Sequence, residues 1–336
     1  MCKNMTMQQN RGRNGGIELL RILCMFGFVC LHVIGYSSIA PFGNQNPQSW
    51  FLLHLRYLLN VGVDIFAFIS GYFGIRFSIR KFLNLLYIGI FSSVVVFCAE
   101  IYFFNVEFRI ISLVQIFLKN WYFREYLILF LLSPFINLYL EQTRRETLNK
   151  LILPLVILFI WNFLATQLPS SFGQTDSLGN HSAMLLIIIY LLGRILNKTE
   201  YLEKINTWVL FVILLICLPV LFCISRLKDF SSPFCILSAI SLFELFRRLP
   251  INAWITNIVC FLSPSMLGIL ILHNAGSNQI AGGLVHRYFD AYECNLAGLA
   301  FLKYAIIIFS CSLIIDMVRR IILFLIEKIF KGVIGK

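Results

Sequence analysis

The chain has 336 residues, of which 59% are hydrophobic and 13% are charged. Soluble domains have roughly 45–50% apolar and 25% charged residues, so this composition excludes an ordinary soluble protein and indicates a polytopic membrane protein. The formal net charge of +12 could suit nucleic acid, but the lysines and arginines stand at the ends of apolar segments and form no basic run. We therefore interpret the charge as a signal of membrane orientation and expect no nucleic-acid partner.

Apolar segments follow one another along the whole chain and predict an all-α bundle of about ten transmembrane helices. The sixth and eighth segments are short for a hydrocarbon core of roughly 30 Å. Ile251–Leu262 is expected to lie on the membrane as an interfacial helix, and Ser263 with Pro264 to start the next helix. The ten segments are Ile17–Tyr36, Phe51–Phe73, Phe82–Phe104, Trp121–Leu140, Leu151–Leu168, Ser182–Leu196, Trp208–Ile224, Pro233–Phe246, Ser263–Leu284 and Leu299–Ile315.

The first apolar run, about twenty residues long, lacks a small-residue cleavage site, which favours a retained span over a signal peptide. We expect a cytoplasmic tail at 1–16, one integral-membrane domain at 17–330 and a second cytoplasmic tail at 331–336. The ten cysteines are scattered singly and form no CxxC pair. They are expected to be small core residues, so the sequence predicts no metal site, and no bound cofactor is expected.

The distribution of lysine and arginine predicts the orientation of the spans. Twenty of the 28 basic residues fall on the side of the N-terminus in this arrangement, and eight fall on the other side or in the outer halves of spans. Because cytoplasmic loops carry the excess of positive charge, both termini should be cytoplasmic. The predicted outer loops, which are polar and almost free of cations, are Ser37–Ser49, Pro169–His181 and Asn278–Leu296.

The first span carries three ionisable residues, Glu18, Arg21 and His32. Eleven residues make about three helical turns, so Arg21 and His32 share a face, and Glu18 falls on the same stripe. Ionisable groups inside a bilayer mostly face a bundle interior or take part in function. Two plainer interpretations stay open: Glu18 and Arg21 could simply form an i,i+3 ion pair, and His32 could be a core imidazole bonded to a carbonyl.

Four segments in chain order resemble motifs of the membrane acyltransferase-3 family, and together they extend over most of the chain. The last of them has Leu270 where the family usually has tyrosine. The segments are Ile17–Arg21 with His32, Gly62–Tyr72, Trp121–Tyr126 followed by Leu131–Pro134, and Met266–Asn274.

This resemblance implies transfer of an acyl group, usually acetyl from cytoplasmic acetyl-CoA, to a hydroxyl of a sugar, lipid or peptide. Bacterial members commonly modify surface polysaccharides from the cytoplasmic (inner) membrane. The short loops and the lack of an appended domain are similar to stand-alone polysaccharide O-acetyltransferases. A glycan or lipid-linked sugar acceptor and an acyl-CoA co-substrate are therefore expected.

Histidine fits this chemistry, because attack of a hydroxyl on a thioester needs a base of near-neutral pKa. His32 is therefore the expected general base, although the sequence leaves open whether it instead carries the acyl group. Arg21, about 16 Å away along the helix, would hold donor phosphates at the cytoplasmic mouth. Glu18 completes the expected catalytic set.

Two further groups of residues are candidates. The first is a donor-binding group in and after the Ser-Gly-Tyr turn. Its cations could equally well be membrane anchors under the positive-inside rule. The second group would line the site or contact the acceptor. In the second group Asp64 could orient His32, and the aromatic residues could belong to an interfacial belt. Gly71 and Gly268 are expected to permit close helix approach. The donor-binding group is Ser70, Gly71, Tyr72, Arg76, Arg80 and Lys81, and the site-lining group is Asp64, Trp121, Glu125, Tyr126, His273 and Asn274.

A transporter or flippase of a lipid-linked glycan is the alternative function. It would share the many spans, the buried charges and the polar outer loops. Such proteins usually show inverted repeats and helices broken by Gly or Pro at matching positions of two halves, and the sequence displays neither feature.

Overall fold

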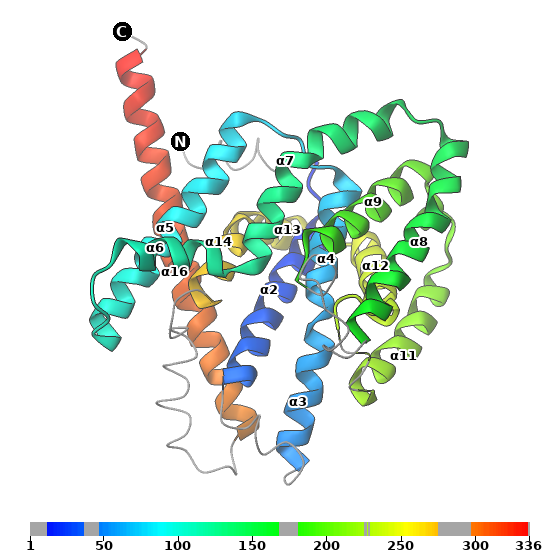
Figure 1. Ribbon diagram of the computed structural model, residues 1–336, viewed down its shortest axis with the longest axis horizontal. Coiled ribbons are helices and arrows are strands. Elements are labelled where there is room, and N and C mark those ends of the chain that lie inside the picture. The colour runs from blue at the N-terminus through cyan, green and yellow to red at the C-terminus, as the bar shows by residue number, and fades with distance from the viewer. Residues whose placement is uncertain are drawn as a thin grey trace.

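The computed structural model of the chain describes residues 12–36, 47–167, 181–224, 227, 229–274 and 297–334, and these residues form helices with no strand among them (Figure 1). The predicted outer loops lie wholly or largely outside these ranges. The helices are α2 (Gly15–Tyr36), α3 (Pro47–Leu59), α4 (Val61–Phe73), α5 (Ile79–Phe104), α6 (Ile110–Lys119), α7 (Trp121–Gln142), α8 (Arg145–Gln167), α9 (Ala183–Thr199), α10 (Tyr201–Lys204), α11 (Thr207–Cys223), α12 (Pro233–Arg248), α13 (Ala253–Leu262), η3 (Ser263–Ser265), α14 (Met266–Asn274) and α16 (Ala297–Ile334).

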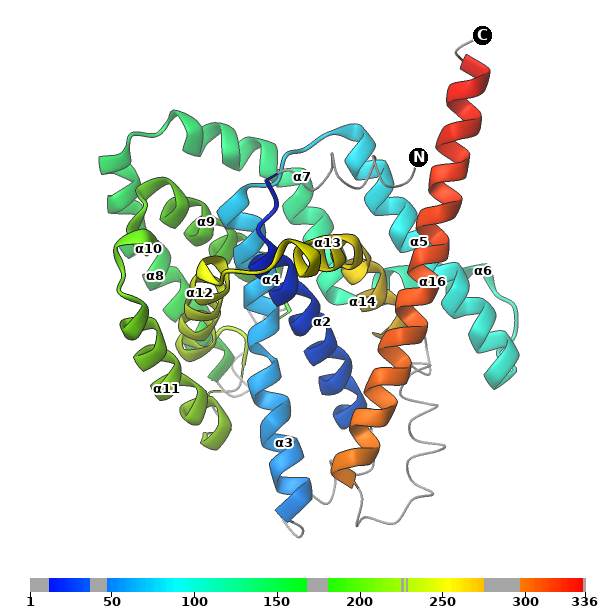
Figure 2. The same cartoon turned by 180° about the vertical axis from the view of Figure 1, so that it is seen from behind.

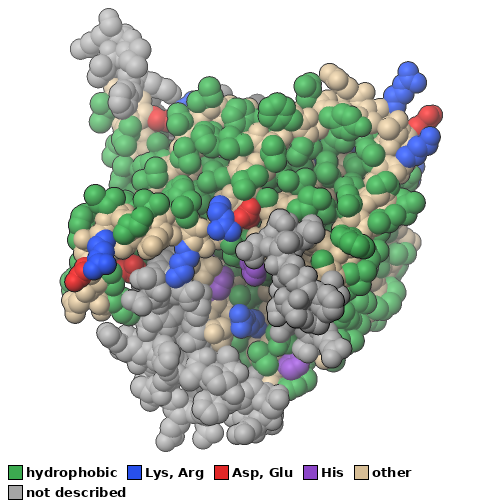
Figure 3. All heavy atoms as spheres, in the orientation of Figure 1, with side chains coloured by type: hydrophobic (Ala, Val, Ile, Leu, Met, Phe, Trp, Pro, Cys, Tyr) green, Lys and Arg blue, Asp and Glu red, His purple; other side chains and the backbone are tan. Residues whose placement is uncertain are grey.

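Six helical runs of the described chain are long and apolar enough to cross a membrane. The predicted sixth and eighth segments correspond to α9 and α12, which are short as expected, with 17 and 16 residues. Many large apolar side chains face outward, and Figure 3 shows them covering most of one face of the molecule. Such a surface suits lipid rather than water. The six runs are Gly15–Gly35, Trp50–Phe73, Ile79–Phe104, Trp121–Gln142, Arg145–Gln167 and Ala253–Asn274.

The helical run around Pro264 differs from the prediction. Ser263 does not start a new helix, because the chain passes from α13 through the 3₁₀ turn η3 directly into α14. The proline is accommodated at the start of that turn, where its missing N–H needs no partner. The Ser263 hydroxyl accepts a hydrogen bond from Arg13 Nη2 instead of capping a helix. The whole run Ala253–Asn274 therefore qualifies as one candidate span, where the sequence predicted an interfacial helix followed by a separate span.

Helix α2 occupies the centre of the bundle. It packs against α3, α4, α12, α13, α14 and α16, and both cartoon views show it surrounded by these helices (Figures 1 and 2). The side chain of Asn14 fixes its first turn by accepting from the backbone N–H of Ile17 and donating to the carbonyl of Arg247. The central position explains how a single helix can present ionisable groups to several neighbours at once.

Two glycines permit close helix contacts, as predicted. A Cβ atom at Gly71 would overlap the backbone carbonyl of Tyr190, so α4 and α9 can pack closely only with glycine there. A Cβ at Gly268 would overlap the carboxylate of Asp316, so α14 and α16 can pack closely there only with glycine. Small residues at such crossings are typical of helix packing in membranes.

Candidate active site

His32 on α2 and His273 on α14 form a pair in the interior of the bundle. The two nitrogens His32 Nδ1 and His273 Nε2 are 2.9 Å apart, and the ring centroids are 5.0 Å apart. His273 is buried, and its Nδ1 lies 2.6 Å from the carbonyl oxygen of Ile269, one turn earlier on its own helix. The predicted site residue His273 thus lies in direct contact with His32.

This arrangement specifies the tautomers of the two neutral rings. The Ile269 carbonyl can only accept, so His273 Nδ1 carries the proton and His273 Nε2 bears the lone pair. His32 Nδ1 must then be the donor of the bond between the rings. In this assignment the lone pair of His32 lies on Nε2, which makes Nε2 the basic nitrogen of the pair. The His32 ring also has a hydrogen bond with the backbone of Phe28, one turn earlier on α2.

His32 lines a narrow cavity of about 40 Å³. Asn120, Trp121 and Asn274 supply polar or aromatic groups to its wall. Trp121 stacks on Phe230 with ring centroids 5.6 Å apart, which fixes the indole at this wall. Of the predicted site-lining residues, Trp121 and Asn274 therefore lie beside the candidate base.

Arg21 lines a larger cavity of about 200 Å³. Ser70 of α4 and Tyr126 of α7 contribute hydroxyl groups to it, and Met25 and Leu267 are among its apolar lining residues. The mixture of one guanidinium, hydroxyls and apolar side chains suits a ligand that has both polar and apolar parts.

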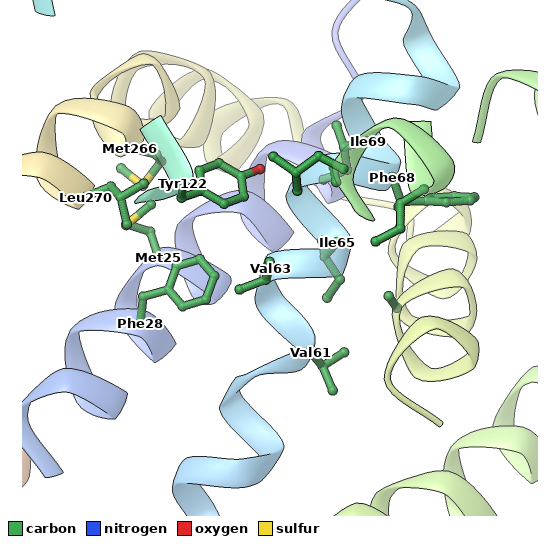
Figure 4. Packing of buried hydrophobic residues seen from close by; sticks show 14 of the residues in the cluster. Met25, Phe28, Val61, Val63, Ile65, Phe68, Ile69, Tyr122, Met266 and Leu270 are labelled. Atoms are coloured by element: carbon green, nitrogen blue, oxygen red, sulfur yellow. The ribbon is translucent and has the colours of Figure 1, made fainter. Parts of the chain in front are cut away.

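The two cavities adjoin each other. Phe28, Tyr122 and Leu270 line both, so these three side chains form the wall between the Arg21 end and the His32 end. Figure 4 shows Phe28, Tyr122 and Leu270 converging from α2, α7 and α14, together with Met25 and Met266. Arg21 and His32 thus share a face of α2, as predicted, and this face is turned toward two adjoining cavities.

Glu18 is the centre of a charge cluster at the start of α2. Its carboxylate accepts from Arg13 Nε at 3.0 Å and from Arg21 Nη1 at 3.3 Å. The predicted i,i+3 pair with Arg21 is confirmed, and Arg13 joins it as a second cation. Two guanidinium groups around one buried carboxylate offset the loss of its hydration and leave a net positive charge beside the larger cavity.

Asp64 and Glu125 do not meet the candidate base. The Asp64 carboxylate is buried, and neither oxygen has a hydrogen-bond partner among the described residues, so the idea that Asp64 orients His32 is wrong in this structure. His273 occupies that orienting position. Glu125 pairs with its neighbour Arg124 at 2.8 Å and lines neither of the two cavities.

The predicted donor-binding residues divide into two groups. Ser70 lines the Arg21 cavity, whereas Gly71 packs on α9 and Tyr72 lies under the guanidinium of Arg247. The three basic residues after α4 are exposed at the surface. Arg80 pairs there with Glu327 of α16, and Lys81 donates to the backbone carbonyl of Arg76.

Sequence reasoning missed two cations. Arg13 was counted as a tail residue, and nothing in its local sequence reveals that it reaches both Glu18 and Ser263. Arg56 of α3 lies within electrostatic reach of His32 and against Gly35 on the same helix as His32. The only signal for Arg56 was its place among the few cations that the sequence predicted for the outer side or the outer halves of the spans.

A family comparison agrees with this geometry. The model of the acyltransferase-3 family, described as an acyltransferase domain, matches residues 14–317, which is nearly the whole chain. Neither a curated protein nor a solved structure matches the chain. The matched region includes α2, α4, α7 and α14, the helices that carry the two cavities, and together with the six candidate spans it indicates a membrane acyltransferase. The chain belongs to the acyltransferase-3 family.

Proposed function

We propose that this protein transfers an acyl group, most simply acetyl, from cytoplasmic acyl-CoA to a hydroxyl of a cell-surface glycan or its lipid-linked precursor. The observation that carries the proposal is the hydrogen-bonded pair of His32 and His273 beside a cavity that adjoins the one lined by Arg21. A neutral imidazole of fixed tautomer inside a membrane bundle is suited to take a proton from a hydroxyl.

The transfer can be written with every proton assigned. The acceptor hydroxyl gives its proton to His32 Nε2 while its oxygen attacks the thioester carbonyl, forming a tetrahedral oxyanion. When the intermediate collapses, the carbon–sulfur bond breaks and the imidazolium returns the proton to the departing CoA thiolate. Arg56, within electrostatic reach of His32, is placed to favour the negative charge that develops in this step.

The cavity of about 200 Å³ is the proposed passage for the thioester arm of the donor. Arg21 at one end supplies positive charge, and the hydroxyls of Ser70 and Tyr126 can bond to the amides of a pantetheine chain. Arg21 and His32 are separated by about 16 Å along α2, so an extended arm is needed to bring the thioester to the base. This requirement fits a long thioester donor better than a compact one.

We further propose about ten spans with both termini in the cytoplasm of a bacterium, the protein lying in its inner membrane. The excess of basic residues on the side of the N-terminus supports this orientation. The start of α2 and the end of α16 also lie toward the same end of the molecule (Figures 1 and 2). His32 then lies nearer the outer face, where a glycan acceptor could enter.

A direct test uses purified protein in lipid nanodiscs with acetyl-CoA labelled in the acetyl group. We expect saturable binding, slow release of free CoA and transfer of label to the native glycan. The mass of that glycan from cells with and without the protein should differ by whole acetyl groups. A protein that moves lipid-linked glycan across vesicles without using acetyl-CoA would contradict the proposal and favour a flippase.

Sidedness provides a second prediction. In a cysteine-free background, a single cysteine at the exposed position Glu107, between α5 and α6, should react with a membrane-impermeant thiol reagent in intact cells. Cysteines at the exposed positions Arg76 and Arg144 should react only after the cells are opened. The reverse pattern would invert the topology, place His32 on the donor's side and remove the need for a passage across the membrane.

A further inference from the structure

A third cavity, of about 540 Å³, lies beside the start of α2. Arg13, Arg319 and Arg320 line it, and its remaining wall is largely apolar, with Ile88 and Phe324 among its residues. These residues come from the segment before α2 and from α5 and α16, and Figure 2 shows α13 lying between the start of α2 and α16. None of the predicted site residues lines it.

The charge of this cavity is unbalanced. The carboxylate of Asp316 pairs with Arg319 at 2.7 Å, and that of Glu18 pairs with Arg13 at 2.8 Å. Glu327, the one carboxylate in the described lining, pairs with Arg80 at 2.8 Å. Arg320 instead donates to the carbonyl of Phe261 and the hydroxyl of Ser265, both of which are neutral. Its positive charge is therefore held in place by acceptors that do not neutralise it. A fixed guanidinium of this kind, next to two more, recognises phosphate oxygens.

The cavity adjoins the proposed donor passage. Pro264 lines both this cavity and the one that contains Arg21. Arg13 also lies between the two cavities. Its guanidinium donates to Ser263, which lines the Arg21 cavity, and to Glu18. Glu18 in turn accepts from Arg21. A ligand with phosphates at Arg320 could therefore extend a long arm past Pro264 toward Arg21 and His32.

We propose that this cavity binds the phosphate-bearing nucleotide end of the acyl-CoA donor, with Arg13, Arg319 and Arg320 as the phosphate ligands. This inference rests on the proposed function and replaces the exposed group Arg76, Arg80 and Lys81 as the donor site. The apolar wall formed by Ile88 and Phe324 offers a surface for the flat adenine ring. An anionic lipid headgroup presents the same phosphate chemistry, and the test separates the two sources.

The test compares two donors in nanodiscs of phosphatidylcholine, which carries no net charge. Acetyl-CoA contains the nucleotide phosphates, whereas S-acetylpantetheine has the same thioester arm without them. Arg320→Gln should weaken acetyl-CoA binding roughly 10- to 100-fold, as loss of a charge-assisted contact does, and leave the kcat/KM for S-acetylpantetheine unchanged. Arg320→Lys should retain part of the affinity because it keeps the charge but not the planar fork.

A control variant and the contrary outcomes complete the test. Arg109→Gln, at an exposed site between α5 and α6, should bind acetyl-CoA as the wild type does. An equal loss of activity with both donors in Arg320→Gln would overturn the site, and so would a loss of acetyl-CoA affinity in Arg76→Gln with none in Arg320→Gln. In either case turnover by the wild type would leave the proposed function intact. If Arg320→Gln retained less bound phosphatidylglycerol than the wild type, while its acetyl-CoA affinity was unchanged, the cavity would be a lipid site instead. Absence of any acetyl-CoA binding by the wild type would overturn the proposed function and this site with it.

Discussion

Replacement of His32 by alanine is expected to reduce acyl transfer roughly 10²–10⁴-fold, the usual contribution of a general base. The physical reason is that His32 is the one imidazole among the described residues that line the narrow cavity. The measurement is the rate of labelled acetyl transfer by protein purified in nanodiscs. Donor affinity should change little, because the proposed phosphate contacts lie at the other end of α2.

The matched control is His54→Ala. His54 is another histidine of a candidate span, buried against Trp50 and bonded to the carbonyl of that residue, but it lines none of the three cavities. His54→Ala should therefore keep its transfer activity even if its thermal stability falls. Wild-type rates in His32→Ala would remove His32 from the mechanism, and equal losses in both variants would indicate a packing role for these histidines.

Local regularities of the sequence were enough to predict most of the long helices and the arrangement of the ionisable residues on α2, but not the short helix α6 or the division of the second predicted span into α3 and α4. The separation of eleven residues from Arg21 to His32 is a property of one helix, so the shared face followed from helical geometry alone. The pair of Glu18 and Arg21 followed in the same way from its i,i+3 spacing. Gly71 and Gly268 were recognisable because small residues in apolar helices mark close crossings.

Contacts between distant helices were beyond such reasoning. His32 and His273 are 241 residues apart, and the periodicity of either helix cannot tell which residue faces which. For that reason Asp64, on α4, was considered as a possible orienting residue for His32, although the structure gives that position to His273. Arg320 could only be counted as an anchoring charge, because its cavity is assembled from α5, α13 and α16.

Replacement of His273 by phenylalanine is the second change with a large expected effect. Phenylalanine fills a similar volume but removes the acceptor at the position of Nε2, so the His32 ring loses the partner that fixes its tautomer. We expect kcat to fall on the order of 10²-fold, the lower range for loss of a correctly poised base, with the KM for acetyl-CoA unchanged. Steady-state kinetics at saturating acceptor would measure both quantities.

The separation of an orienting role from a packing role depends on a second variant, His273→Gln. The glutamine side-chain oxygen can accept from His32 Nδ1, so this variant should recover much of the activity that phenylalanine loses, although glutamine packs less well in a buried site. If His273 mattered only for packing between α14 and its neighbours, phenylalanine would be the better tolerated of the two, and thermal stability would follow activity. A glutamine variant that is as inactive as the phenylalanine variant, with both proteins folded, would show that His273 takes part in the transfer in some way other than holding the His32 tautomer.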